Sequence, residues 1–233
     1  APRKLYSIWI LKYKERPRIN SEYSNRVLNG SPTSIQQYPI LAQMLLDVWG
    51  TYTLPQYWKI RVGSTYRSRG GVLHKVKTIV PHYGFDKRYY TNDIAVVVVA
   101  KRFTLGNLVR QGTIIKPGTE LVPNSVCTLV GWGATEPDQL QYSMMLIINQ
   151  EECKTHYQAI GAIIADSMIC AGQLDVDGVD GCFGDSGGPI LYKGVVVGLV
   201  SFGYACGLKY YPGVYTKVSY YTDWIIQTVS SNK

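Results

Sequence analysis

Short runs of β-branched and apolar residues alternate with turn residues along most of this chain. The runs include WKIRVGS, HKVKTIV, DIAVVVV, VCTLVGW and GVVVGLVSF, and the turns between them include NGSP, RSRGG, KPG, GWG, GDSGGP and YPG. Valine and isoleucine favour strands, whereas glycine, proline and asparagine favour turns. Strand-length runs at this spacing predict an all-β sandwich or barrel.

Two stretches depart from this rhythm and predict helices. Residues 220–230 carry Trp224, Ile225 and Thr228 at helical spacing near the end of the chain. Residues 149–157, NQEECKTHY, begin with Asn149, which can cap a helix, and place Glu152 three residues later. We therefore expect a β protein with one short internal helix and one C-terminal helix.

The composition is that of a globular protein. The 233 residues are 46% hydrophobic and 17% charged, enough for one large domain or two packed halves. The longest apolar runs, residues 95–100 and 194–203, fall short of the ~20 residues of a membrane span. The net charge is +8, but the basic residues are scattered and form no stripe, so neither nucleic acid nor membrane is an expected partner.

The chain has five cysteines: Cys127, Cys153, Cys170, Cys182 and Cys206. No pair has the CxxC spacing of zinc sites, so we expect no metal and no cofactor. Four of them could make two disulfides, which indicates an oxidising, extracellular location. A complete signal peptide is not visible in the first residues.

The sequence GCFGDSGGP, residues 181–189, places Ser186 between glycines and directly after Asp185. A serine in this setting could be a nucleophile, but its hydroxyl needs a base, most often a histidine. The chain has three histidines: His74, His82 and His156.

Several motifs follow one another in a familiar order. They are RVLNG (26–30), YP (38–39), NDIAVV (92–97), GWG (131–133), GDSGGP and PGVYTKV (212–218). In this order the chain resembles the chymotrypsin-family serine proteases of the trypsin branch, above all the digestive trypsins of insects. The resemblance implies two packed antiparallel β-barrels with a C-terminal helix. Residues 1–26 would be an extension or propeptide, 27–111 a truncated first barrel, and 112–233 the second barrel and helix.

The resemblance also implies roles for individual residues. Ser186 matches the nucleophile, and Asp93 matches the carboxylate that orients the histidine base. The backbone N–H groups of Gly184 and Ser186 match the oxyanion hole. Cleavage after Arg26 would free the amine of Val27 to pair with Asp185, as in the activation of the family's zymogens.

A specificity pocket follows from the same resemblance. Asp180 matches the pocket-floor carboxylate, which favours Arg or Lys side chains. Gly203 and Gly213 match the glycines that keep the pocket open, and Ser201, Phe202 and Gly203 match the strand that pairs with substrate. The expected partners are peptides or proteins carrying Arg or Lys, or protease inhibitors, and the expected state is a monomer.

The cysteines fit the family in part. Cys153–Cys170 and Cys182–Cys206 match two family disulfides. The family partner position of Cys127 falls at Tyr192, so Cys127 is expected to be a free buried thiol.

The family's histidine segment, CGGSLI…VLTAAHC in its usual form, is absent. It would lie between Gln56 and Tyr57, within residues 38–64, where both flanks match the family. Both cysteines of that segment are absent with it, which indicates one contiguous deletion. The three remaining histidines are expected to be structural or surface residues.

The missing segment has a consequence for folding and leaves the activity open. Removing about two strands would expose unpaired backbone groups, and residues 6–11 (YSIWIL) could pair into the gap. A trypsin-like endopeptidase without its base would be inactive or very weak. The first alternative is an active secreted trypsin whose true sequence contains the segment. The others are a non-catalytic binding or decoy homologue and an enzyme with a relocated base.

Overall fold

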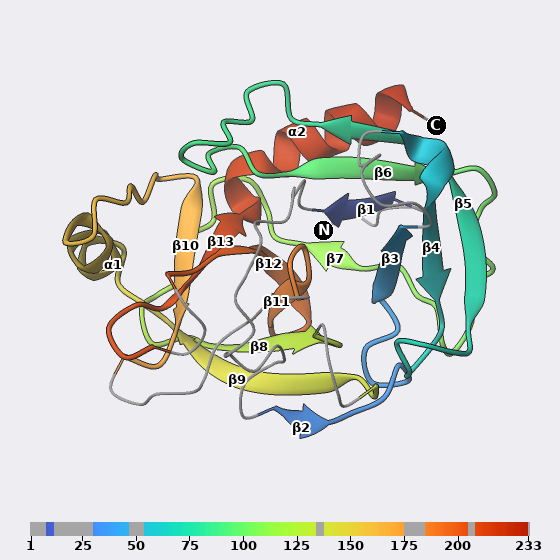
Figure 1. The fold of residues 1–233 in the computed structure, drawn as a ribbon, viewed down its shortest axis with the longest axis horizontal. Helices are drawn as coiled ribbons and strands as arrows, with labels where there is room; N and C mark the ends of the chain where they lie inside the picture. Colours follow the sequence, from blue (N-terminus) through green and yellow to red (C-terminus); the bar gives the residue numbers. More distant parts are fainter. Residues whose placement is uncertain are drawn as a thin grey trace.

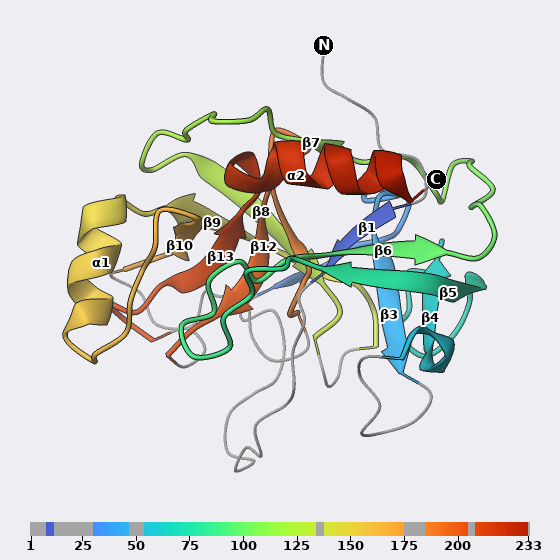
Figure 2. The same cartoon turned by 90° about the horizontal axis from the view of Figure 1, so that it is seen from above.

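The computed structural model describes residues 8–11, 30–46, 54–133, 138–174, 185–204 and 208–232. Its strands form two groups that lie side by side, with the C-terminal helix laid along both (Figures 1 and 2). Residues 8–11 are described by their backbone alone.

The first group is an antiparallel five-stranded sheet. Its order is β1 (Ile8–Leu11), β6 (Ala95–Val99), β5 (Val72–Pro81), β4 (Trp58–Val62) and β3 (Ala42–Leu46). A 3-10 turn, η1 (Pro55–Tyr57), leads into β4. Within the described residues this sheet ends at β1 and β3 and does not close, so the expected incomplete first barrel is confirmed.

Strand β1 covers an edge of β6 that the sequence left without a partner. The two strands run antiparallel, from Ile8 opposite Val98 to Leu11 opposite Ala95. All five residues of β6 are buried in the folded chain, and β1 supplies pairing partners along this edge of the strand. The hypothesis that residues 6–11 pair into the gap is confirmed for residues 8–11.

The second group is a closed barrel of six strands. They follow the order β10 (Met168–Gly172), β13 (Gly213–Lys217), β12 (Val195–Phe202), β11 (Pro189–Tyr192), β8 (Val126–Gly131) and β9 (Gln141–Ile147), and β9 pairs with β10. Two short strands attach to it, β2 (Ser31–Pro32) on β9 and β7 (Thr113–Ile114) parallel to β12. Closure removes the free strand edges. The predicted fold class, two packed antiparallel β structures with the first incomplete, is confirmed.

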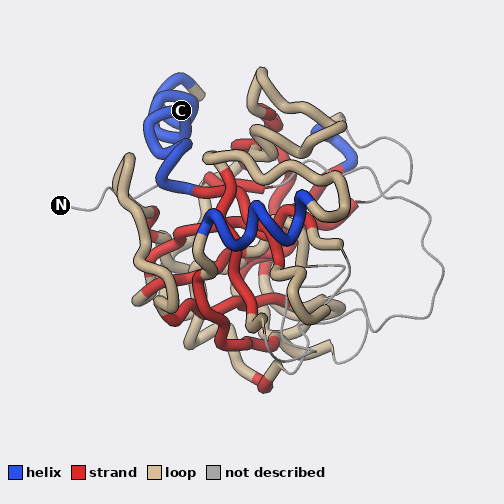
Figure 3. The backbone as a smooth tube through the Cα atoms, turned by 90° about the vertical axis from the view of Figure 1, so that its left-hand side faces the viewer, coloured by secondary structure: helices blue, strands red, loops and turns tan. Residues whose placement is uncertain are grey.

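Both predicted helices are present and lie outside the strands (Figure 3). Helix α1 (Gln150–Gln158) is capped by Asn149, whose Oδ1 accepts the N–H groups of Glu151 at 2.9 Å and Glu152 at 3.2 Å. Helix α2 (Val218–Ser231) begins two residues before the predicted start, because Val218 is itself buried against the core. It contacts β6, β7 and β12, so it joins the two strand groups. No helix in the described parts of the chain is long and apolar enough to cross a bilayer.

Strand β6 also joins the two groups through its side chains. Val96 and Val98 pack in the large core that includes residues of the second barrel, whereas Val97 and Val99 pack with Ile60 inside the first sheet. Alternation along one strand thus places apolar groups in both cores. Asp93, two residues before β6, is therefore held at the junction between them.

Candidate functional site

Asp93 is buried at this junction, with 1% of its surface exposed. The hydroxyl of Ser201 on β12 donates to Oδ2 of Asp93 at 2.7 Å, and the hydroxyl of Thr216 on β13 donates to its main-chain oxygen at 2.8 Å. A hydrogen bond from a hydroxyl satisfies a carboxylate oxygen that burial removes from water. The carboxylate is thus tied to the second barrel although its own chain segment leads into the first sheet.

The segment before Asp93 is held by side-chain hydrogen bonds. Asn92 has a φ of 54°, and its Nδ2 donates to the Gly84 carbonyl at 2.8 Å. The hydroxyl of Tyr221 on α2 donates to Asn92 Oδ1 at 3.0 Å. Burial raises the pKa of Tyr221, which keeps the phenol protonated as a donor. Asn92 therefore fixes the left-handed turn that presents Asp93.

Ser186 lies in a tight turn directly before β11 and is half-buried. The turn is attached to β12, because Gly187 N–H donates to the Val200 carbonyl at 3.0 Å and Val200 N–H donates to the Gly188 carbonyl at 2.9 Å. Ser201, the next residue of β12, binds Asp93. Two consecutive residues of one strand thus bring the Ser186 turn and the Asp93 carboxylate together.

Asp185, beside the serine, is buried under the GWG motif. Its Oδ1 accepts the N–H of Gly133 at 3.0 Å, and 3% of its surface is exposed. A Cβ on Gly131 would lie 2.1 Å from the same Oδ1, so only glycine fits there. Gly133 has a φ of 62°, which also favours glycine. Both glycines of the motif are therefore explained by one buried carboxylate.

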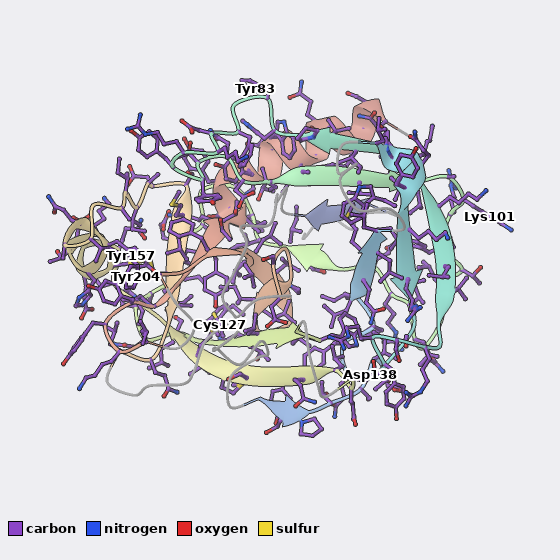
Figure 4. The ribbon with its side chains drawn as sticks, viewed as in Figure 1. Tyr83, Lys101, Cys127, Asp138, Tyr157 and Tyr204 are labelled. Atoms are coloured by element: carbon purple, nitrogen blue, oxygen red, sulfur yellow. A yellow bond between two sulfur atoms is a disulfide. The ribbon has the colours of Figure 1, made fainter. Side chains whose placement is uncertain are left out.

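The described part of the expected substrate strand is lined by aromatic rings. Phe202 lies 5.4 Å from the Tyr90 ring and 6.0 Å, edge to face, from the Tyr157 ring. Tyr157 also donates its hydroxyl to the Pro212 carbonyl at 2.7 Å, and Tyr204 lies on the same side of the molecule (Figure 4). Gly213 begins β13 and is buried, whereas Gly203 is exposed. The expected site residues Arg26, Val27, Asp180 and Gly184 lie outside the described residues.

The three histidines have ring contacts in three separate places. The His74 ring meets Phe103 edge to face at 4.7 Å, and its Nδ1 lies 3.2 Å from the Lys101 carbonyl. His156 stacks on Tyr210 at 5.7 Å.

His82 packs against α2. Its ring lies 4.9 Å from Trp224, 5.5 Å from Tyr221 and 4.7 Å from Tyr83, and its Nδ1 accepts the N–H of Gly84. Burial lowers the pKa of His82. With Nδ1 accepting, the neutral ring carries its proton on Nε2, so neither nitrogen is positioned in these contacts as a proton acceptor for a serine.

The cysteine predictions are confirmed where the structure describes them. Cys153 and Cys170 form a disulfide with their Cα atoms 6.4 Å apart. Cys127 is a free thiol, fully buried on β8 (Figure 4), and burial raises its pKa to about 11. Cys182 and Cys206 lie outside the described residues. No group of three or more His, Cys, Asp or Glu side chains that could hold a metal gathers within the described ranges.

The fold and this site together define a class: a chymotrypsin-like serine protease homologue with a Ser186 turn and a buried aspartate. A trypsin family model matches residues 51–225. Trypsin CFT-1 of Choristoneura fumiferana is 36% identical over 234 residues, covering 88% of this chain and 91% of that protein. Trypsin of Phaedon cochleariae is 37% identical over 235 residues, covering 90% of each. The chain belongs to the trypsin family of serine proteases.

A solved structure supports the fold independently. The crystal structure of the scabies mite inactivated protease paralogue S-D1 matches with a TM-score of 0.77 and 21% identity, covering 88% of this chain and 98% of that one.

Sequence reasoning missed several groups that hold the site. The side chain of Ser201 was expected to matter only through its strand. Asn92 and Thr216 lie in the motifs NDIAVV and PGVYTKV but were given no role of their own, and Tyr221 was not singled out. Their partners are far away in sequence: Ser201 and Asp93 are separated by 108 residues, and Thr216 and Asp93 by 123. The GWG motif was a signal, but its meaning depended on the position of Asp185.

Proposed function

We propose that this chain is a trypsin-type homologue that keeps the serine, the aspartate and the cation pocket but lacks an effective general base. It would bind Arg- or Lys-bearing peptides and proteins, or protease inhibitors, and hydrolyse them very slowly or not at all. The observation that carries the proposal is the placement of the three histidines, whose described contacts are with Phe103, with α2 and Tyr83, and with Tyr210.

The chemical argument concerns the proton of Ser186. Without a base to accept it the hydroxyl remains a weak nucleophile. Loss of the histidine in a serine-protease triad lowers kcat by about 10⁶, and the oxyanion hole and binding leave roughly 10³–10⁴ over water. Residual activity of that order is the expectation for the cleaved chain.

The expected pocket gives the proposal its ligand class. Asp180 would pair with a guanidinium or ammonium group, because a cation entering a narrow pocket needs a counter-charge. Gly203 and Gly213 would leave space above it. Cleavage after Arg26 would let the Val27 amine pair with Asp185 and order the pocket. The Cys153–Cys170 disulfide favours an extracellular location, where the protein would act as a monomer.

The comparisons fit the absence of a segment, and the fold accommodates it. The alignments with the two trypsins run over 234 and 235 residues, more than the 233 of this chain, so those relatives have residues with no counterpart in the given sequence. Strand β1 also pairs with β6, which gives the shortened chain a partner for that buried strand. The fold itself is compatible with lost catalysis, since the scabies mite relative is described as an inactivated paralogue.

The first alternative is an active secreted trypsin whose natural sequence contains the missing segment. A family-type segment with its two cysteines and AAHC, inserted between Gln56 and Tyr57, separates the two hypotheses. If selection for catalysis kept the remaining parts, the repaired, cleaved protein gains cleavage after Arg and Lys that Ser186→Ala abolishes. A repaired chain that folds and binds benzamidine but shows no serine-dependent turnover favours the binding role.

The direct test is an assay of the chain as written, cleaved after Arg26, on Arg and Lys esters. We expect very low kcat/KM together with measurable benzamidine binding that Asp180→Ala removes. Trypsin-like turnover lost in Ser186→Ala would refute the proposal. If it were also lost in His82→Gln but kept in His156→Gln, the alternative of a relocated base would replace it.

A further inference from the structure

The loop after β4, residues 63–71, is fastened to Asp138, which precedes β9. Oδ1 of Asp138 accepts the N–H of Ser68 at 2.8 Å, and Oδ2 accepts the Ser68 hydroxyl at 2.7 Å and Nη1 of Arg69 at 3.0 Å. The Asp138 main-chain oxygen accepts the N–H of Arg67 at 2.8 Å. Asp138 lies between the second barrel and the first sheet (Figure 4).

The loop is also held from the first sheet. Arg61 on β4 donates to the Arg67 carbonyl, and Gln43 on β3 donates through Nε2 to the Tyr66 carbonyl at 3.1 Å. The Arg69 guanidinium lies 3.9 Å from the centre of the Tyr66 ring, a cation–π contact. The loop therefore has one defined shape, fixed by the sheet below it and by Asp138 beside it.

The same loop contacts the GWG motif. The Thr65 carbonyl accepts Nε1 of Trp132 at 3.0 Å, and Nη1 of Arg67 lies 3.4 Å from the Gly133 carbonyl. Gly133 in turn donates its N–H to Asp185. Gly133 thus contacts the loop through its carbonyl and Asp185 through its N–H. One residue therefore connects the loop to Asp185.

Asp185 connects this chain of contacts to the serine. It precedes Ser186, and its main-chain oxygen accepts the N–H of Gly188 at 2.7 Å, which closes the turn. We propose that Asp138 is a positioning residue for the Ser186 turn, acting through Arg67, Gly133 and Asp185. The contacts of Asp138 given above are with Arg67, Ser68 and Arg69, and Ser186 is not among them. The importance of the Ser186 turn rests on the proposed function. The contacts that lead from Asp138 to this turn do not depend on it.

The test is amide hydrogen exchange, measured by NMR on the full chain. In Asp138→Ala, the amides of Gly133 and Gly187 are expected to exchange about tenfold faster, because a charged acceptor with three donors is lost. Asp138→Asn should give a smaller increase, since its Oδ1 can still accept from Ser68. Arg67→Ala should speed exchange at Gly133 while the Ser68 amide stays protected.

The matched control is Asp166→Asn. Asp166 is an exposed carboxylate that pairs with Lys154 at 3.2 Å beside α1, and its loss should leave Gly133 and Gly187 unchanged. Faster exchange at Ser68 with unchanged Gly133 and Gly187 in Asp138→Ala would overturn the proposal. If Asp138→Ala does not fold, unchanged exchange at Gly133 in Arg67→Ala overturns it in the same way.

Benzamidine binding keeps this proposal separate from the proposed function. Weaker binding in Asp138→Ala than in Asp166→Asn would extend the positioning role to the pocket. If the wild type does not bind benzamidine but the exchange results hold, the pocket assignment fails and the positioning role of Asp138 stands.

Discussion

Replacing Ser201 with alanine tests whether the Ser201 hydroxyl stabilises the buried side chain of Asp93 as an ionised carboxylate. The change removes the hydroxyl that donates to Oδ2 of Asp93 at 2.7 Å. Both residues are buried, with 3% of the surface of Ser201 and 1% of the surface of Asp93 exposed. Water has little access to replace this donor, so we expect a loss of about 2–3 kcal/mol in the free energy of unfolding. Urea denaturation monitored by tryptophan fluorescence measures the difference.

A double-mutant cycle with Asp93→Asn identifies the cause of that loss. If the hydroxyl stabilises the charge, Ser201→Ala should cost clearly less in the Asp93→Asn background. Thr216→Val is the matched control: it removes a donor to the neutral main-chain oxygen of Asp93, and should cost about 1 kcal/mol. A Ser201→Ala cost below about 0.5 kcal/mol, or one equal in both backgrounds, would contradict the reasoning.

The pKa of Asp138 lies below its ordinary value, mainly because its carboxylate accepts a hydrogen bond from the Ser68 hydroxyl. The Ser68 N–H and the charges of Arg69 and Arg67 lower it further, and desolvation opposes them. The ionised Asp138 therefore stabilises the fold above its unfolded pKa, and this contribution is lost as pH falls below about 4. The difference in free energy of unfolding between wild type and Asp138→Asn should shrink there, and a constant difference would contradict this. Cys127, buried with a pKa of about 11, should react with a thiol reagent at pH 8 only as fast as the protein opens, and fast labelling of the native protein would contradict its burial. Ile10→Pro should speed exchange of the β6 amides relative to the β12 amides, because proline removes a donor and disrupts the pairing of β1; equal exchange would show that β6 does not depend on β1.

The second barrel could be predicted from the sequence because its signals are local. Turn residues lie between valine-rich runs, Asn149 caps α1 within its own first turn, and residues 150–158 follow directly. The start of α2 was placed two residues late because it depends on a tertiary contact rather than on a local signal. Val218 and Ser219 are buried against the core, so the tertiary contact extends the helix beyond its amphipathic pattern.

The contacts around the site could not be predicted in the same way. Asp138 and Ser68 are polar residues 70 positions apart, and neither lies in a motif. Isolated polar residues in turns are usually solvated, so nothing in the pattern distinguishes these two. The glycines of GWG were visible as a motif, but the reason for Gly131, a carboxylate oxygen in the place of its Cβ, exists only in the folded chain.

The pairing of β1 with β6 changes how the missing segment should be understood. Removing strands from a barrel would leave β6, buried along its whole length, with an unsatisfied edge. Residues 8–11 pair with that edge in antiparallel register. The shortened sheet therefore leaves fewer backbone groups unpaired than the sequence suggested. Any segment restored between Gln56 and Tyr57 that brings a strand to β6 would have to displace β1. A repaired protein therefore tests two things at once, the return of the base and the exchange of one strand for another. Exchange at the β6 amides, compared before and after repair, separates them.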